Sequence, residues 1–463
     1  MKYRNYQLRM INAQDQFMAN PHVKRATILA ATGSGKTVVF TDLIEKLLGA
    51  VSGGARRVLI VHPRLALSSD QQRRLRSSLQ NKNVEFTAFS SGEVYNTLDT
   101  QINVSTTSRE RLEEIMESAG GRAHITFSSY KSLSKIADMP FDLIICDEAH
   151  YLVQNELREN LTLFQSKVLF YTGTPIRVAA DDAGMDNTDL FGPIIAEVPF
   201  SELLPGNYVV SPRVRSLHGW SKGQGNVIDY PRIIALAYRE QLIQVNSQFN
   251  HKMLVALPNT QFFDDTMDSL SEIRKLVDDP NLDVYYVTGE RVCKNGAIQS
   301  GTDSRVAMLR DFAENPRHCI ILHCDTLAEG IDIDGIGGIL LLRDLSTSKL
   351  LQTLGRACRP AVEDVLPDGE IREDRIKTHA LVTLVEVNNE LLGCAKLEKL
   401  VEQFSVAGYG HLWDLIDPEV AQQHRIMGES GNQDESIVWD KLVSMRIAEG
   451  GRVLYEEWFG TTP

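Results

Sequence analysis

One stretch near the amino terminus constrains the fold of this chain more than any other. Residues 30–37 read Ala-Ala-Thr-Gly-Ser-Gly-Lys-Thr, between a short apolar run at 27–29 and a segment whose apolar residues recur at helical spacing. A strand, a loop of small residues and a helix in this order predict a phosphate-binding loop, in which Ala30 takes the place of the usual first glycine. The alternative is a flexible glycine turn before a helix.

The residue types in this loop suit phosphate chemistry. Two glycines let successive backbone N–H groups turn inward, toward the positive end of the following helix. Lys36 would reach the β- and γ-phosphates of a nucleotide, and the hydroxyl of Thr37 would bind Mg²⁺. The predicted nucleotide contacts of the loop are Ala31, Thr32, Gly33, Ser34, Gly35, Lys36 and Thr37.

The length of the chain and its apolar runs limit the class of protein. With 463 residues, the chain is too long for one ordinary core, so we expect two or three domains. Its apolar runs are too short for a membrane span and no secretion signal opens it, so we expect a cytoplasmic protein that is not secreted. The six cysteines include no C-x-x-C pair, which favours buried reduced thiols over a metal site.

The net charge of −13 is unevenly distributed. Residues 1–82 contain 14 Lys and Arg but only 4 Asp and Glu, a balance of +10, and the remainder therefore carries −23. Such asymmetry permits a basic, nucleic-acid-binding surface on an acidic protein. A solvated charged face is the commoner explanation.

Apolar runs alternate with polar or helical stretches from residue 55 to 200. The predicted strands are 58–62, 84–88, 124–127, 143–147, 168–171 and 195–198. This alternation predicts a parallel sheet with helices on both faces, whose ligands lie beyond the carboxyl ends of the strands. Notable residues follow several of these strands, namely His62 to Arg64, Ser128 to Tyr130, Asp147 to His150, and Thr172 to Pro175.

The buried run at 141–146 ends in two adjacent carboxylates. Asp147 at the strand tip would hold Mg²⁺ through water, and Glu148 would orient and deprotonate an attacking water. The hydroxyls of Thr172 and Thr174 would link the state of the nucleotide to the grip on a substrate. For an isolated Asp-Glu pair, a charged loop after a core strand is the alternative.

Residues 206–229 are rich in glycine and lack periodicity, so we expect a linker. A second alternating region follows, with a predicted helix at 231–249 and strands at 253–257, 283–287, 319–323, 339–342 and 380–387. The sequence therefore predicts two domains of one architecture, at 1–205 and 230–395. Residues 396–463 are predicted to be helical, and they would cap the second domain or dock a partner.

Two polar groups follow strands of this second region. Gly330 would permit close approach of a nucleotide, and Asp332 would accept a hydrogen bond from its ribose. Gln352, Arg356 and Arg359 share one face of a predicted helix. Such arginines are usually salt-bridged surface residues, but opposite a triphosphate they would stabilise the charge that develops during transfer.

Three residues before the first strand are candidates for base recognition. Gln7 presents a donor and acceptors that suit the edges of adenine, and Arg4 and Tyr6 offer flat surfaces beside it. The alternative for this short segment is the start of a helix.

Taken together and in order, these segments resemble the motifs of superfamily 2 helicases over roughly residues 1–390. The similar segments are 4–7 (Q motif), 30–37 (motif I), 63–64 (motif Ia), 147–150 (motif II, Asp-Glu-Ala-His), 172–175 (motif III), 326–332 (motif V) and 352–359 (motif VI). Motif III reads Thr-Gly-Thr here, where relatives often have Thr-Ala-Thr.

The resemblance implies an α/β fold of two tandem RecA-like domains with parallel sheets, and ATP with Mg²⁺ as cofactors. The catalytic residues would be Lys36, Asp147, Glu148, Gln352, Arg356 and Arg359, with Mg²⁺ at Thr37 and Asp147. The nucleotide contacts outside the loop would be Arg4, Tyr6, Gln7, Gly330 and Asp332. The nucleic-acid contacts would be Pro63, Arg64, Ser129, Tyr130, Thr288, Gly289 and Thr326, and the coupling residues would be His150, Thr172 and Thr174.

The resemblance also implies an ATP-dependent helicase or translocase. Two groups of the superfamily are the most similar: DNA repair and recombination helicases, and restriction-enzyme motor subunits. The chain shares with them the Arg-x-Tyr-Gln opening at 4–7, the form of motif III and a short tail, which differ from RNA-remodelling DEAH-box proteins. We therefore expect DNA rather than RNA as the partner. Three hypotheses stay open: a DNA helicase of repair, recombination or replication, a motor of a restriction or defence complex, and an RNA helicase or ATP-gated nucleic-acid clamp.

Overall fold

The computed structural model divides the chain into two compact units, Met1–Pro199 and Phe200–Pro463. Within them it describes residues 3–49, 57–63, 75, 77–79, 84–89, 104–119, 122–175, 184–218, 221–222, 227–246, 248–259, 266–288, 291–299, 302–324, 333–343, 345, 347–387 and 390–392. The helical segment expected at 396–463 lies outside these residues.

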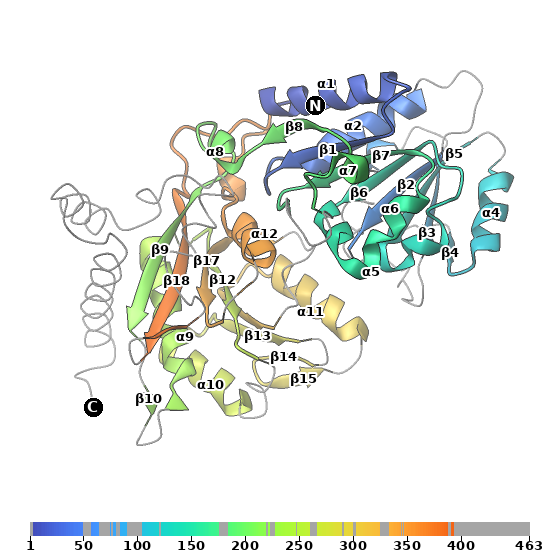
Figure 1. Cartoon of the computed structure of the whole chain (residues 1–463). Helices are drawn as coiled ribbons and strands as arrows, with labels where there is room; N and C mark the ends of the chain where they lie inside the picture. Colours follow the sequence, from blue (N-terminus) through green and yellow to red (C-terminus); the bar gives the residue numbers. More distant parts are fainter. Residues whose placement is uncertain are drawn as a thin grey trace, which may run out of the picture. The chain divides into compact units, whose positions relative to one another are not determined.

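The first unit is built on a parallel sheet (Figure 1), whose described part contains eight strands in the order β4-β3-β5-β2-β6-β7-β1-β8. The strands are β1 (Arg25–Ala30), β2 (Arg57–His62), β3 (Val84–Phe89), β4 (Val104–Thr106), β5 (Ala123–Ser129), β6 (Leu143–Asp147), β7 (Lys167–Thr172) and β8 (Ile194–Val198). Strands β2, β6 and β7 are buried along almost their whole length. Continuous burial explains why they read as unbroken apolar runs rather than as alternating patterns.

Helices cover both faces of this sheet. They are α1 (Asn5–Ala19), α2 (Lys36–Gly49), α4 (Arg109–Ser118), α5 (Asn155–Arg158), α6 (Asn160–Leu163) and α7 (Thr188–Phe191), with the 3₁₀ turns η2 (Tyr130–Lys135) and η3 (Ala149–Val153). One face packs on α1 and α2: Tyr171 of β7 meets the ring of Phe40 edge-on at 5.7 Å and donates its hydroxyl to Gln14 at 2.7 Å. On the other face, Ile144 and Phe170 pack in one cluster with side chains of α4, η2 and η3.

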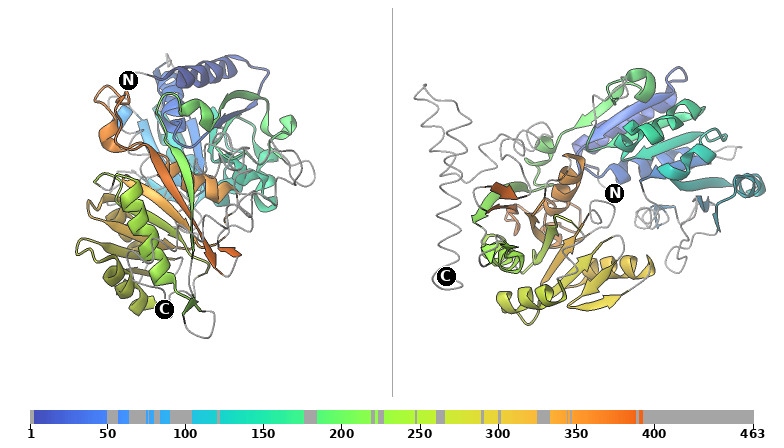
Figure 2. Two further views of the ribbon diagram at one scale, coloured as in Figure 1. Left: turned by 90° about the vertical axis from the view of Figure 1, so that its left-hand side faces the viewer. Right: turned by 60° about the horizontal axis from the view of Figure 1, so that its bottom comes forward.

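The second unit contains a mixed sheet of nine strands in its described part (Figure 2). The strands are β9 (Ser211–His218), β12 (Lys252–Ala256), β13 (Asp283–Val287), β14 (Val292–Lys294), β15 (Ala297–Gln299), β16 (Cys319–His323), β17 (Ile336–Leu341), β18 (His379–Val387) and β19 (Glu390–Leu392). Their order is β15-β14-β13-β16-β12-β17-β18-β19, and β9 also pairs with β18. The central strands are parallel, while β14, β15 and β19 are antiparallel additions at the edges.

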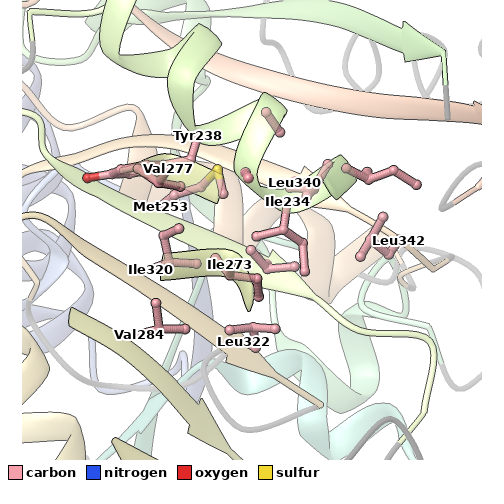
Figure 3. Packing of buried hydrophobic residues seen from close by; sticks show 14 of the residues in the cluster. Ile234, Tyr238, Met253, Ile273, Val277, Val284, Ile320, Leu322, Leu340 and Leu342 are labelled. Carbon is pink, nitrogen blue, oxygen red and sulfur yellow. The ribbon is translucent and has the colours of Figure 1, made fainter. Parts of the chain in front are cut away.

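The remaining elements of this unit are α8 (Phe200–Leu203), β10 (Ser221–Lys222), β11 (Val227–Ile228), α9 (Tyr230–Gln244), α10 (Thr266–Val277), α11 (Thr302–Glu314), α12 (Thr347–Ala357) and η7 (Val362–Asp364). Helices α9 and α10 pack on one face of the sheet through a cluster that includes Ile234, Ile273 and Ile320 (Figure 3). Gln241 of α9 reaches β17, where a Cβ on Gly337 or Gly338 would lie 2.6 Å from its amide. Two glycines therefore permit this close approach of helix to strand.

The segment expected to be a linker contains a strand instead. Strand β9, at 211–218, pairs in parallel with β18 over eight residues, from Ser211 with His379 to His218 with Glu386. The segment contains Pro212 and two arginines, so it lacks the apolar pattern that predicts a strand. It forms one because a segment more than 160 residues away supplies the pairing. The predicted helix at 231–249 also ends earlier, at Gln244.

The fold class is confirmed as two α/β units, each built on a sheet whose central strands are parallel. Of the cysteines in described segments, Cys146, Cys293, Cys319 and Cys358 are buried and Cys324 is partly exposed. None of the helices in the described part of the chain is both long and apolar enough to cross a lipid bilayer.

Candidate nucleotide site of the first unit

The sheet of the first unit brings the predicted motifs together at the carboxyl ends of its central strands. Strand β6 lies between β2 and β7, and β7 lies beside β1, all in parallel register. His62, Asp147, Thr172 and Ala30 end these four strands, so their side chains or carbonyls share one edge. Binding sites of parallel sheets form at this edge.

The loop after β1 has the backbone of a phosphate-binding turn. Gly33 and Gly35 have φ angles of 90° and 83°, in the left-handed region that favours glycine. The N–H of Ser34 donates to the carbonyl of Ala31 at 3.1 Å, which closes the turn before α2 begins at Lys36. The Ser34 side chain is buried, and its hydroxyl has no hydrogen-bond partner among the described residues.

Lys36 joins this loop to the end of β6. Its ammonium donates to the carbonyl of Ala30 at 3.3 Å and lies 3.6 Å from Oε1 of Glu148. Both distances leave the ammonium facing the loop, where incoming phosphate oxygens would be stronger partners than a single carbonyl. The predicted phosphate-binding lysine and the predicted base are therefore neighbours in space.

The two adjacent carboxylates have different environments. Asp147 is buried, and its Oδ1 accepts a hydrogen bond from the N–H of Glu148 at 3.1 Å. Glu148 has φ 53° and ψ 48°, a left-handed conformation that is uncommon for a residue with a Cβ. This backbone turn sends its carboxylate toward Lys36, and strained residues of this kind cluster at functional sites.

His150 lies with the threonines that follow β7. Its Nδ1 is 3.0 Å from the hydroxyl of Thr172 and 3.1 Å from that of Thr174. The N–H of Thr174 also donates to the Thr172 hydroxyl at 3.1 Å, and all three side chains are buried. Because Nδ1 also lies 3.5 Å from Oε2 of Glu148, this cluster connects the end of β7 to the candidate base.

Gly173, between those threonines, packs directly on the phosphate loop. A Cβ at this position would lie 2.9 Å from the carbonyl of Ala30, 3.2 Å from the N–H nitrogen of Thr32 and 3.3 Å from the ammonium of Lys36. The glycine that distinguishes this motif from Thr-Ala-Thr therefore lets the loop approach β7 closely.

The helix alternative for the amino-terminal segment is confirmed, since α1 begins at Asn5. Gln7 is buried and donates from Nε2 to the carbonyl of Ser34 at 3.1 Å, while its Oε1 accepts from the N–H of Arg4 at 3.1 Å. The Arg4 guanidinium donates to the hydroxyl of Tyr6 at 2.9 Å. The amide of Gln7 is thus bound to the phosphate loop, and the adenine contact stays a prediction.

Oxygen ligands suitable for Mg²⁺ are present beside the loop. Thr37 lies in the first turn of α2 and is partly exposed, and Asp147 lies at the end of β6. Among the described residues, no group of three or more His, Cys, Asp and Glu could form an all-protein metal cage. A hydroxyl and one carboxylate fit Mg²⁺ at nucleotide sites, where phosphates and water supply the remaining ligands.

The predicted nucleic-acid contact of Tyr130 is wrong for its side chain. The ring is 1% exposed, and its hydroxyl donates to the backbone carbonyl of Asp147 at 2.7 Å. Burial raises the pKa of this hydroxyl well above its ordinary value, so it remains a donor. Tyr130 therefore fixes the end of β6 from the start of η2, the turn that follows β5.

Other predicted nucleic-acid contacts have mixed outcomes. Ser129 is mostly buried, with its hydroxyl 3.1 Å from that of Ser132, and Pro63 is partly exposed at the end of β2. The contact predicted for Thr288 is wrong for its side chain, because it is 4% exposed and its hydroxyl bonds both the N–H and the carbonyl of Arg291. The predicted residues Arg64, Gly289, Thr326, Gly330 and Asp332 lie outside the described residues.

The basic bias of residues 1–82 is partly structural. Arg25 donates to the carbonyls of Leu161, Asp189 and Leu190, and Arg9 donates to that of Glu197. These cations tie strands and turns together, so their charge gives no evidence of a nucleic-acid surface.

In the second unit, α12 carries the residues of the predicted arginine face. Gln352 and Arg356 lie within the helix and are mostly buried, whereas Arg359 follows it and is partly exposed. The ammonium of Lys377 donates to the carbonyl of Ala357 at 2.6 Å, which anchors the carboxyl end of α12. Burial of Lys377 lowers its pKa to about 8.

Two residues near the site had been given no role of their own in the sequence analysis. His62 faces Asp147, with Nδ1 3.6 Å from Oδ2, and Gly173 packs on the loop as described above. The only signal for His62 was its position directly after an apolar run and before Pro63.

The chain is similar in sequence to known proteins. Residues 1–177 match the family described as "Type III restriction enzyme, res subunit". A Saccharomyces cerevisiae protein named "Putative ATP-dependent helicase IRC3" is 22% identical over 357 residues, which cover 73% of this chain and 46% of that protein.

Solved structures also resemble the chain. The Type ISP restriction-modification enzyme LlaBIII bound to DNA has a TM-score of 0.61 at 16% identity, with 100% of this chain and 33% of that chain covered. A nuclease-deletion mutant of the Type ISP restriction-modification enzyme LlaGI in complex with a DNA substrate mimic has a TM-score of 0.58 at 16% identity, with 96% of this chain and 31% of that chain covered. The DEAD-box helicase Mss116 bound to ssRNA and UDP-BeF has a TM-score of 0.52 at 14% identity, with 88% of this chain and 77% of that chain covered.

The resemblance to superfamily 2 helicases, and to restriction-enzyme motor subunits among them, is confirmed by these matches. The structural likenesses show a shared fold. The chain spans about half the length of the yeast relative and about a third of the Type ISP enzymes.

Proposed function

We propose that this chain is an ATP-dependent nucleic-acid motor that hydrolyses ATP at the carboxyl edge of its first sheet. The observation that carries the proposal is the convergence of Lys36, Glu148 and Asp147 on a glycine-bearing loop with left-handed turns. A structural ion pair explains one such contact, but it does not explain the loop backbone and the strained Glu148 together.

In this mechanism the loop binds the phosphates and Lys36 neutralises their charge. Thr37 and Asp147 would hold Mg²⁺, which supplies charge stabilisation at the transferring phosphoryl group. Glu148 orients the attacking water and takes its proton. We further propose that Gln352, Arg356 and Arg359 act on the same reaction, with the arginines stabilising the charge that develops in transfer.

Nucleotide state would reach the nucleic acid through the cluster of His150, Thr172 and Thr174. Oε2 of Glu148 lies 3.5 Å from Nδ1 of His150, and the same nitrogen contacts the hydroxyls of both threonines. A movement of Glu148 would therefore reach the two threonines through this histidine. Cycles of ATP binding and phosphate release would then alternate two grips on a strand. Backbone contacts would make this grip largely independent of sequence and sensitive to salt.

We propose DNA rather than RNA as the partner, and strand separation or remodelling in repair, recombination or replication as the role. The Type ISP neighbours described as bound to DNA or to a DNA substrate mimic support DNA, although the Mss116 complex contains ssRNA. The match to a restriction-enzyme subunit family over residues 1–177 favours a second candidate, the motor of a restriction or defence complex.

The decisive experiment compares the ATPase rate without nucleic acid and with single-stranded DNA, duplex DNA, forked DNA and RNA. We expect stimulation by DNA in the presence of Mg²⁺, and its loss in Lys36→Ala and Glu148→Gln. Normal turnover in either variant would remove the site assignment, and stronger stimulation by RNA would overturn the choice of DNA. A strand-displacement assay beside a translocation assay on blocked duplex then separates a helicase from a translocase or a clamp.

A further inference from the structure

His62 lies at the end of β2, next to the carboxylate that the proposed function assigns to Mg²⁺. Its Nδ1 is 3.6 Å from Oδ2 of Asp147, and its side chain is 2% exposed. Strands β2 and β6 are parallel neighbours, and Val61 pairs with Cys146. The next residues of the two strands, His62 and Asp147, therefore lie side by side at the edge of the sheet. The sheet itself therefore holds the imidazole beside the carboxylate.

Packing alone does not account for a histidine at this position. The imidazole stacks on the buried ring of Phe127, with 6.4 Å between centroids and 15° between planes. Its Nε2 atom is buried and has no hydrogen-bond partner in the described part of the chain. An apolar side chain of similar size would fill the space without burying an unpaired nitrogen, so the polar ring is retained at a cost.

The hydrogen bonds around Asp147 indicate a role for the imidazole of His62 in orienting this carboxylate. The hydroxyl of Tyr130 holds the backbone carbonyl of Asp147 at 2.7 Å, and the N–H of Glu148 holds Oδ1 at 3.1 Å. The other carboxylate oxygen, Oδ2, faces Nδ1 of His62. A donor on this oxygen would fix the plane of the carboxylate, whose backbone and first oxygen are already fixed.

We propose that His62 is a positioning residue that donates from Nδ1 to Oδ2 of Asp147 and orients this carboxylate for Mg²⁺. The inference rests on the proposed function, because it needs Asp147 to be a metal ligand. His62 itself would touch neither the metal nor the nucleotide. Removal of such an outer-shell partner typically weakens metal binding about 10–100-fold.

Two substitutions separate positioning from packing. His62→Leu keeps an apolar body of comparable size but removes the donor, whereas His62→Asn places an amide nitrogen the same number of bonds from Cβ as Nδ1. Binding of a fluorescent ADP analogue is measured for the full chain in EDTA and at increasing Mg²⁺, together with the thermal unfolding midpoint. This readout needs no turnover.

We expect His62→Leu to raise the Mg²⁺ concentration for half-maximal tightening of nucleotide binding about 10-fold, with unchanged affinity in EDTA. His62→Asn should stay within about threefold of the unsubstituted protein, because its amide replaces the donor. Unchanged Mg²⁺ dependence in the leucine variant, an asparagine variant as weak as the leucine variant, or equal losses in EDTA would overturn the proposal. If the unsubstituted protein fails to bind the analogue with or without Mg²⁺, the proposed function itself fails.

Discussion

The side-chain amide of Gln7 donates to the backbone carbonyl of Ser34 over 3.1 Å, although the two residues are 27 positions apart. The contact joins the first turn of α1 to the phosphate loop, and a Cβ on Gly35 would lie 2.6 Å from the same amide nitrogen. The loop is therefore shaped partly by a helix that precedes the sheet.

We expect Gln7→Ala to weaken nucleotide binding about 5-fold, because the loop loses a buried hydrogen bond of roughly 1 kcal/mol that holds its shape. Equilibrium binding of a fluorescent ATP analogue measures this. Gln16→Ala, at an exposed position of the same helix, is the matched control and should bind normally. Equal affinity of the two variants would contradict a role for Gln7 in the loop.

We expect Gly173→Ala to destabilise the nucleotide-free protein by about 1–3 kcal/mol, because the added methyl would crowd the carbonyl of Ala30 at 2.9 Å. Urea unfolding of the two proteins measures the difference. Nucleotide affinity should fall as well, since the loop must shift away from β7. A variant of unchanged stability and affinity would show that the loop relaxes freely.

We expect Thr172→Val to reduce the stimulation of ATP turnover by DNA at least about 10-fold while basal turnover changes less. The substitution keeps the shape of the side chain but removes the hydroxyl that bonds His150 and the N–H of Thr174. Turnover with and without DNA checks this. Thr27→Val on β1, which removes a buried hydroxyl that donates to the backbone carbonyl of Phe191, is the control for stability and should retain stimulation. Parallel loss in both variants would indicate a general packing defect.

We expect Arg356→Ala to leave ATP binding nearly unchanged while hydrolysis falls at least about 100-fold, the behaviour of a group that acts in the transition state. Binding and single-turnover rates should be measured on one preparation. Arg372→Ala removes a partly exposed arginine paired with Asp374 and should have no effect. Loss of binding in Arg356→Ala would instead assign the residue a structural role.

Glu240 gives a pH prediction in the second unit. Burial raises the pKa of this carboxyl from 4.5 to about 7, against the opposing effect of Arg215. The folded state therefore binds more protons than the unfolded state between pH 4.5 and 7, so the free energy of unfolding falls as pH rises through this window. Above pH 7 the carboxyl is ionised in the folded state, and the full cost of burying its charge lowers the free energy of unfolding.

Glu240→Gln should consequently be more stable than the unsubstituted protein at pH 8, by about 1–3 kcal/mol, and this advantage should shrink toward pH 5. Urea unfolding at pH 5, 6, 7 and 8 measures the trend. An advantage that does not vary with pH would contradict titration of this carboxyl.

The order of residues along the chain was enough to predict the phosphate loop, the strands that lead into it and the class of fold. Fully buried parallel strands must be apolar throughout, and a loop that turns its N–H groups inward needs glycine, so both features are visible in local sequence. The tip of β6 could be placed for the same reason, because two carboxylates after an apolar run mark the end of a strand.

The side chains that meet around that tip could not be predicted in the same way, because they come from segments far apart in the chain. Tyr130 looked like a surface contact, yet it is buried because η2 turns it back under β6, where its hydroxyl finds the carbonyl of Asp147. His62 became the neighbour of Asp147 because β2 and β6 pair, and β9 became a strand because β18 supplies its hydrogen bonds. Periodicity reports whether a residue is buried, whereas the partners of a buried polar group depend on strand order and register, which chain-distant segments set together.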